Sequence, residues 1–144
     1  MWLDTSVLAS LYVPEPRSAR VARLVRRAGA SIPFSQLHEL ELANALRLRL
    51  FRREARRHQV DATRARIVED LETGILRRVA VDRPVALAKA IELADHHTSG
   101  VGCRSLDLLH VSAAMTSGSD RFVTADRRQG TVARRAGLPT NRVA

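Results

Sequence analysis

The sequence has 144 residues, of which 45% are apolar, and these values indicate one globular domain rather than a disordered chain. It contains no apolar run near the roughly 18–20 residues that cross a bilayer. Its single cysteine excludes both an internal disulfide and a cysteine-rich zinc module. Basic residues number 24, of which 23 are arginine, against 15 acidic residues. We expect a single domain over residues 1–144, located in the cytoplasm, with no export signal and no membrane contact.

Short apolar strands and amphipathic helices alternate along the chain. In chain order we expect a strand at residues 1–3, helices at 5–12 and 17–28, a strand at 31–34, helices at 35–53 and 62–73, a strand at 75–81, helices at 84–95 and 105–117, a strand at 121–124, a helix at 129–136 and a strand at 139–143. Two longer connections are predicted, a polar hinge at residues 58–61 and a loop with two glycines at 96–104.

This alternation predicts an α/β protein. The strands are too short to form hairpins and are separated by helices, which is the pattern of a parallel sheet with crossover helices. We therefore predict a three-layer α/β/α fold around a central parallel sheet of about five short strands. In sheets of this kind, ligands bind outside the carboxyl ends of the strands.

The positive charge is concentrated in one part of the chain. Residues 17–66 contain 13 arginines and four acidic residues, whereas acidic and basic residues cancel in the remainder. A local surplus of arginine is typical of a surface that binds a polyanion, because the planar guanidinium matches phosphate. The alternative is a solvated face in an arginine-rich chain, and charge alone leaves both interpretations open.

Four carboxylates occupy unusual positions. Asp4 directly follows the first strand and Asp126 lies two residues after the strand at 121–124, so both belong at the rim where ligands bind. Glu41 and Asp107 are flanked by apolar residues on their helices, where an unpaired acid is unfavourable. Each acid also has a structural explanation, as a helix cap, an arginine partner or a turn residue. Four converging carboxylates would repel one another unless a cation such as Mg²⁺ or Mn²⁺ bound between them.

Four segments resemble the PIN domain family, and in particular the VapC toxins of bacterial toxin–antitoxin pairs. In chain order these are LDTSVL at residues 3–8, ELANAL at 41–46, RSLDLLHVSAA at 104–114 and FVTADR at 122–127. By this resemblance the family's four acidic residues are matched by Asp4, Glu41, Asp107 and Asp126. The small hydroxyl residues usual beside them are matched by Thr5, Ser6 and Thr124. Glu39 is disfavoured because the segment LANAL follows Glu41.

The resemblance implies an endoribonuclease that depends on Mg²⁺ or Mn²⁺ and acts as the toxin of a VapBC-type pair. The four acids would hold the metal directly or through water, and the three hydroxyl residues would orient them. It also implies a homodimer and a VapB-like antitoxin, docked where the third and fourth helices carry apolar residues almost all round. That apolar surplus fits a plain core with a homodimer contact as well.

Five arginines follow helical spacing on an expected extension of the helix that carries Glu41, and we expect them to guide the RNA backbone. They are Arg49, Arg52, Arg53, Arg56 and Arg57. Two other functions stay open: a housekeeping PIN ribonuclease of RNA processing or decay, and an RNA-binding module without activity. His110 is expected to be a hydrogen-bonded helix residue rather than a metal ligand. Cys103 has no neighbouring partner for thiol catalysis.

Overall fold

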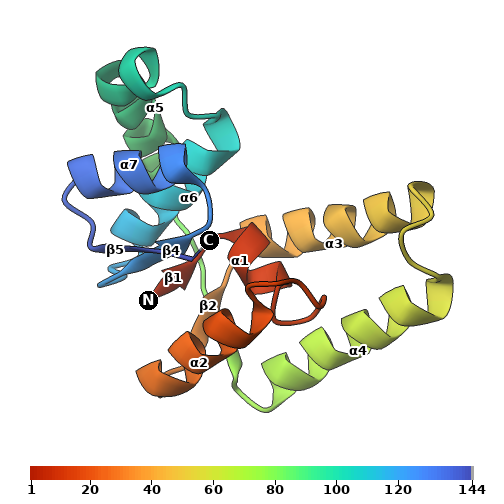
Figure 1. Cartoon of the computed structure of the whole chain (residues 1–144). Helices are drawn as coiled ribbons and strands as arrows, with labels where there is room; N and C mark the ends of the chain where they lie inside the picture. Colours follow the sequence, from red (N-terminus) through yellow and green to blue (C-terminus); the bar gives the residue numbers. More distant parts are fainter. Residues whose placement is uncertain (144) are drawn as a thin grey trace. The chain divides into compact units, whose positions relative to one another are not determined.

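The computed structural model describes residues 1–143 (Figure 1). Contacts divide the chain into two compact units, which we call the terminal unit (residues 1–7 and 80–143) and the central unit (residues 8–79). Each is described by itself below, and the expectation of a single domain over residues 1–144 stays a prediction.

The terminal unit contains a three-stranded parallel sheet with the order β1-β4-β5. Its elements are β1 (Trp2–Leu3), the start of α1 (Thr5–Ala9), α5 (Arg83–Val101), α6 (Ser105–Thr116), β4 (Phe122–Thr124), α7 (Arg127–Arg135) and β5 (Thr140–Arg142). Leu3 pairs with Val123, so β1 and β4 end side by side. The helix α7 packs against β4, β5 and α6, and α5 packs against α6. The fully buried apolar core includes Trp2, Leu3, Val111, Phe122 and Val132.

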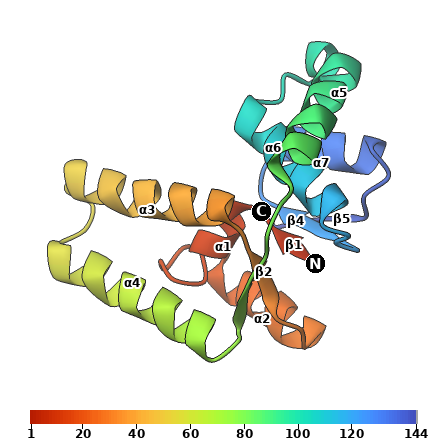
Figure 2. The same ribbon diagram turned by 180° about the vertical axis from the view of Figure 1, so that it is seen from behind.

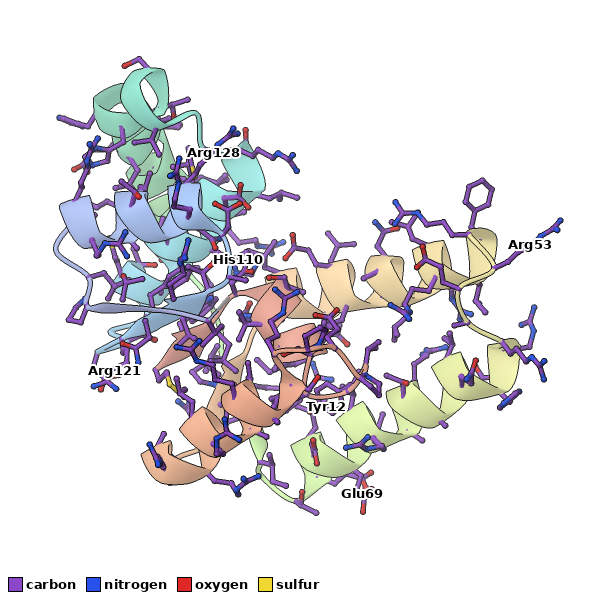
Figure 3. All side chains as sticks on the ribbon, in the orientation of Figure 1. Tyr12, Arg53, Glu69, His110, Arg121 and Arg128 are labelled. Carbon is purple, nitrogen blue, oxygen red and sulfur yellow. The ribbon has the colours of Figure 1, made fainter. Side chains whose placement is uncertain are left out.

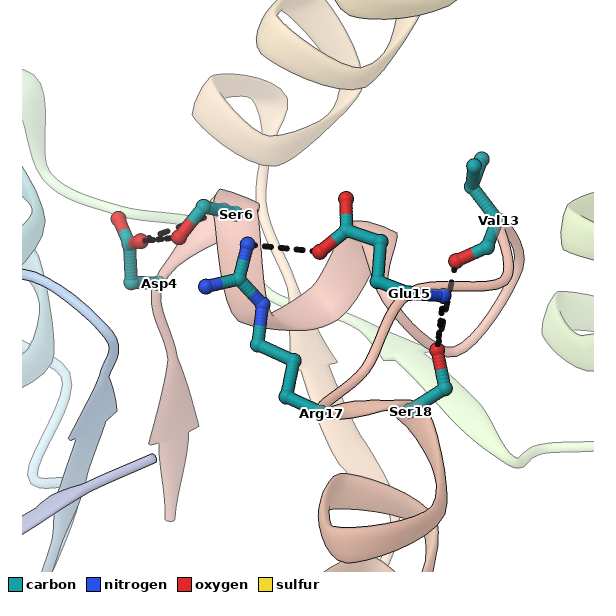
Figure 4. Close-up of polar contacts among 6 residues, drawn as sticks. All are labelled: Asp4, Ser6, Val13, Glu15, Arg17 and Ser18. Atoms are coloured by element: carbon teal, nitrogen blue, oxygen red, sulfur yellow. Dashed lines mark hydrogen bonds and ion pairs between the residues drawn. The ribbon is translucent and has the colours of Figure 1, made fainter. Parts of the chain in front are cut away.

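The central unit contains a two-stranded parallel sheet and three long helices. Its elements are the end of α1, α2 (Ser18–Ala28), β2 (Ile32–Phe34), α3 (Gln36–Phe51), α4 (Arg57–Glu72) and β3 (Leu76–Arg78). The views from both sides show α3 and α4 running alongside each other as a helical hairpin (Figures 1 and 2). Ahead of α2, the Ser18 hydroxyl accepts the Glu15 N–H at 2.9 Å, and Glu15 pairs with Arg17 at 2.7 Å (Figure 4).

The predicted fold class is confirmed, because the chain is a mixed α/β protein with parallel strand pairs and packed helices. Five short strands are present among residues 1–143, and hydrogen bonding groups them as three plus two. All the predicted helices and strands occur, and the differences lie at their ends.

Three predicted boundaries were wrong, two because a side chain caps the start of a helix and one because a glycine ends a helix. The expected hinge at residues 58–61 is helical, since Gln59 Oε1 accepts the Arg56 N–H at 2.8 Å and begins α4 at Arg57. The expected loop at 96–104 is helical as far as Val101 and closes at Gly102, whose φ of 69° suits glycine. The last helix begins at Arg127 rather than at residue 129, because Asp126 caps it.

Candidate active site

Asp4 lies at the carboxyl end of β1 with 8% of its surface exposed. Its N–H donates to the Val123 carbonyl at 2.8 Å, which continues the pairing of β1 with β4 as far as the acid. Oδ2 accepts from the Ser6 hydroxyl at 2.6 Å and from the Ser6 N–H at 3.2 Å (Figure 4). Oδ1 accepts from Gln129 Nε2 at 3.2 Å. Three donors therefore fix the orientation of this carboxylate.

Asp126 follows β4 and caps α7. Its Oδ1 accepts from the N–H groups of Arg128 at 2.6 Å and Gln129 at 2.9 Å, a position where the helix dipole favours negative charge. Its own N–H donates to Thr124 Oγ1 at 3.0 Å. The structural alternative expected for Asp126 was a turn residue, whereas the structure shows a helix cap, which holds an exposed carboxylate beside the end of β4.

Asp107 lies half-buried in the first turn of α6, where Oδ2 accepts from the Arg104 N–H at 3.3 Å. Burial raises the pKa of this carboxyl, the neighbouring charges of Asp4 and Asp126 raise it further, and the bond from Arg104 opposes the rise. At Asp107 the charges of Asp4 and Asp126 thus act in the same direction as burial. The convergence of all four acids on one metal site stays a prediction.

Glu41 lies in the central unit, on α3, and is half-buried. It lies beside the buried stripe of this helix, so its neighbours on the helix include the apolar residues expected from the sequence. That stripe consists of His38, Leu42 and Leu46. Glu39 forms an exposed ion pair with Arg78 on β3 at 3.0 Å. The structure thus gives Glu39 a partner of its own, while the assignment of Glu41 to the metal site stays a prediction.

The predicted hydroxyl residues all contact polar groups of the terminal unit. Ser6 binds Asp4 as described, and Thr124 Oγ1 donates to Gln129 Oε1. Thr5 Oγ1 lies 2.9 Å from Nε2 of His110, whose Nδ1 accepts from the Trp2 indole at 3.2 Å. An indole N–H only donates, so a neutral His110 carries its proton on Nε2 and donates to Thr5. The prediction of a hydrogen-bonded His110 is confirmed (Figure 3).

Gln129 is the residue of this site that the sequence analysis missed. Its side chain is fully buried, and its amide binds Asp4, the Asp107 carbonyl and Thr124. A signal was present, because Gln129 shares a face of α7 with the buried residues Val132 and Ala133 at positions i+3 and i+4. A polar residue on a buried helical stripe needs partners, and the acids are those partners.

Cys103 is buried close to the same acids. Burial, together with the charges of Asp107 and Asp126, raises the pKa of its thiol to about 11. The thiol is therefore neutral near pH 7, which agrees with the expectation that it takes no part in catalysis. Arg128 donates from Nη1 to the Gly102 carbonyl at 3.4 Å, so an exposed guanidinium lies at this edge of the acidic site (Figure 3).

The five predicted RNA-binding arginines lie in the central unit but not on one continuous helix. The helix α3 ends at Phe51 and α4 begins at Arg57, so the arginines between them lie in the turn. Arg53 closes α3 with a left-handed φ of 59° and projects from the tip of the hairpin (Figure 3). Arg52, Arg53, Arg56 and Arg57 are exposed and Arg49 is half-buried. The expected helical extension was wrong, yet the turn still presents the charges to solvent.

The residues of the acidic site fit a divalent cation in their chemistry. Carboxylate oxygens are the ligands that Mg²⁺ and Mn²⁺ prefer, and a cation would offset the burial and the like charges that raise the pKa of Asp107. Across residues 1–143, no three histidine, cysteine, aspartate or glutamate side chains lie close enough together to hold one ion. The four-carboxylate metal site therefore stays a prediction, supported by the chemistry of its donors.

The terminal unit is thus an α/β unit in which the parallel strands β1 and β4 each lead into an acidic residue. The family model for the PIN domain matches residues 1–135, and no curated protein matches the chain. The chain belongs to the PIN domain family. PIN domains are generally nucleases that use divalent metals such as Mg²⁺ and bind RNA. No helix among residues 1–143 has the length and apolar character needed to span a membrane.

Proposed function

We propose that this PIN domain is a Mg²⁺- or Mn²⁺-dependent endoribonuclease and the toxin of a VapBC-type toxin–antitoxin pair. The observation that supports it best is the position of Asp4 and Asp126 at the ends of the paired strands β1 and β4, in a chain that belongs to the PIN domain family. Burial raises the pKa of Asp107, so its charge is unfavourable unless a cation compensates it, and the charges of Asp4 and Asp126 act in the same direction. With Glu41, these three acids form the set that the family resemblance predicted.

Asp4, Glu41, Asp107 and Asp126 would hold the metal. When bound, the metal would activate water and offset charge on the scissile phosphate. Asp4 and Asp126 are oriented before any ligand arrives, the first by Ser6 and Gln129 and the second by the start of α7. Such preorganisation lowers the reorganisation needed in the reaction. Arg128, exposed at the edge of this site, is placed to contact a phosphate oxygen of the substrate.

RNA binding is assigned to the five predicted arginines in and beside the α3–α4 turn. Four of these five are exposed, and the central unit carries 15 arginines against eight acidic residues. Charges of this kind bind phosphates without reading sequence. The chain has 3% aromatic residues, so stacking on bases adds little.

The antitoxin is assigned to a groove of the central unit. Two neighbouring hollows of about 220 and 190 Å³ share the apolar residues Leu42, Leu46 and Ile67 of α3 and α4. Arg49 and Arg52 line the larger hollow together with Glu15 and Glu54, so a partner segment with apolar side chains and charges of both signs fits it. The predicted homodimer has exposed apolar surface available on α5, where Leu87 and Ile91 lie one turn apart. The cytoplasmic location stays a prediction.

RNA cleavage by the wild type and by Asp107→Asn, each with Mn²⁺ and with EDTA, tests the proposed nuclease. We expect cleavage only by the wild type with Mn²⁺. Asp95→Asn is the matched control, because it removes an exposed carboxylate of the same unit, and it should cleave normally. Equal cleavage in every sample indicates a contaminant and contradicts the assignment.

Expression in growing cells separates the remaining functions. A toxin arrests growth, and Asp107→Asn abolishes the arrest. Cleavage without arrest favours the housekeeping ribonuclease instead. RNA binding without cleavage or arrest favours the non-catalytic module.

A further inference from the structure

Gln129, in the first turn of α7, has a fully buried side chain with a strongly polar end. A buried amide is unfavourable unless its donors and its acceptor all find partners. Here Nε2 donates to Asp4 Oδ1 at 3.2 Å and to the Asp107 carbonyl at 3.3 Å, and Oε1 accepts from the Thr124 hydroxyl. Each polar atom of the side chain is thus bonded within the acidic site.

The partners fix which way the amide points. A carboxylate and a backbone carbonyl only accept, so the NH₂ group must face Asp4 and Asp107. The oxygen then needs a donor, and Thr124 supplies one. Thr124 Oγ1 in turn accepts the Asp126 N–H at 3.0 Å, which leaves its own proton for Gln129. The hydrogen bonds therefore run in one direction, from Asp126 through Thr124 and Gln129 to Asp4.

The backbone of Gln129 completes these contacts. Its N–H donates to Asp126 Oδ1 at 2.9 Å, so this single residue binds the side chains of Asp4 and Asp126 and the main chain of Asp107. We propose that Gln129 is the positioning residue that fixes the three acids of the terminal unit relative to one another. This inference rests on the proposed metal-dependent function, and it adds a residue through which the ligands act.

The side chain of Gln129 is neutral, which suits a hydrogen-bond donor behind a metal ligand. A lysine or arginine in the same place would also donate to Asp4, but its charge would neutralise the carboxylate and compete with a cation. An amide orients the oxygen while leaving its full negative charge for the metal. Partners of this kind behind metal ligands typically change metal affinity about 10–100-fold when they are removed.

Mn²⁺ titration of the wild type and of Gln129→Met tests the proposal by calorimetry. Methionine keeps the size and burial of the side chain and removes its hydrogen bonds. We expect the variant to remain folded and to bind Mn²⁺ about 10–100-fold more weakly. Val132→Ala is the matched control, because it loosens the same buried face of α7 without touching a hydrogen bond, so it should lower Tm and leave the affinity unchanged.

Equal Mn²⁺ affinity in the wild type and Gln129→Met overturns the inference. An equal loss of Mn²⁺ affinity in Gln129→Met and Val132→Ala also overturns it, because the loss would then follow from lower stability alone. A wild type that binds no Mn²⁺ overturns the proposed function itself. A spectroscopic readout in the metal-free protein is independent of that outcome. The side-chain amide resonance of Gln129 should move in Asp4→Asn while that of exposed Gln36 stays fixed. An unmoved Gln129 resonance contradicts the contact.

Discussion

The terminal unit buries polar groups around a few carboxylates, whereas the central unit displays a large excess of positive charge. Asp4, Thr5, His110, Thr124 and Gln129 are all buried in the terminal unit, and its nine basic residues nearly balance seven acids. The central unit has 15 arginines against eight acids, most of them exposed on helices and turns. Chemistry at a phosphate needs fixed, water-poor groups, while capture of a polyanion needs only accessible charge. The proposed function therefore assigns the two requirements to different parts of the chain.

The largest expected effect concerns Glu41, the one predicted metal ligand in the central unit. It tests whether the metal site consists of residues of the terminal unit alone. Loss of a hydrogen-bond partner behind a metal ligand lowers metal affinity or activity about 10–100-fold. Glu41→Gln removes a ligand itself, so it should lower the rate of cleavage on the order of 100-fold or more. Initial rates of RNA cleavage at saturating Mn²⁺ measure it. Glu39→Gln is the control two residues away, since it removes only an exposed ion pair worth about 0–1 kcal/mol. Unchanged cleavage by Glu41→Gln would confine the site to the terminal unit.

The next effect concerns the charge of the central unit. Arg52→Glu with Arg56→Glu should weaken RNA binding on the order of tenfold, and should reduce the slope of log affinity against log salt by about 1.4 if two phosphate contacts to single-stranded RNA are lost. The same paired change at Arg20 and Arg23, exposed on α2, serves as the control. Fluorescence anisotropy at several salt concentrations gives both quantities. An equal loss in the two double variants would show a diffuse charge effect instead of a surface at the α3–α4 turn.

The sequence predicted the positions of the acids better than the contacts between them. Asp4 and Asp126 were found because strand ends are readable from short apolar runs, and the carboxyl ends of parallel strands share one rim. The start of α4 was missed because one side chain, Gln59, decides it. Gln129 was missed because its partners lie far away in sequence, up to 125 residues for Asp4. Tertiary hydrogen bonds of that range leave only an indirect mark, here a polar residue on a buried face.

A smaller effect is expected for stability in the central unit, where Tyr12 donates to Asp70 Oδ2 at 2.6 Å beneath Arg66. Tyr12→Phe keeps the ring and removes the bond, so the free energy of unfolding should fall by about 1–2 kcal/mol in urea. Burial and then the bond to Asp70 raise the pKa of Tyr12 above its usual 10.0. Above pH 10 the unfolded chain ionises this group and the folded chain does not, so the wild type loses stability there and Tyr12→Phe loses less.

Tyr12 is the only tyrosine in the sequence, so its ionisation can be followed by ultraviolet absorbance without interference from another phenol. We expect the phenolate signal to appear together with unfolding. A phenolate signal near pH 10 in the folded protein would contradict the buried bond to Asp70.

The smallest effect returns to the acids of the terminal unit and separates their repulsion from their catalytic role. Burial, then the charges of Asp4 and Asp126, raises the pKa of Asp107 above its usual 3.8 in the folded chain. A raised carboxyl pKa means that ionisation of Asp107 destabilises the folded state. The resulting loss in the free energy of unfolding is absent below pH 3.8 and complete above the folded-state pKa. In metal-free protein, Asp107→Asn should therefore gain in Tm over the wild type as the pH rises from 3 to 7. Mn²⁺ should reverse the order at pH 7, because only the wild type binds it well. If the Tm difference between Asp107→Asn and the wild type changes with neither pH nor Mn²⁺, the three carboxylates do not interact electrostatically.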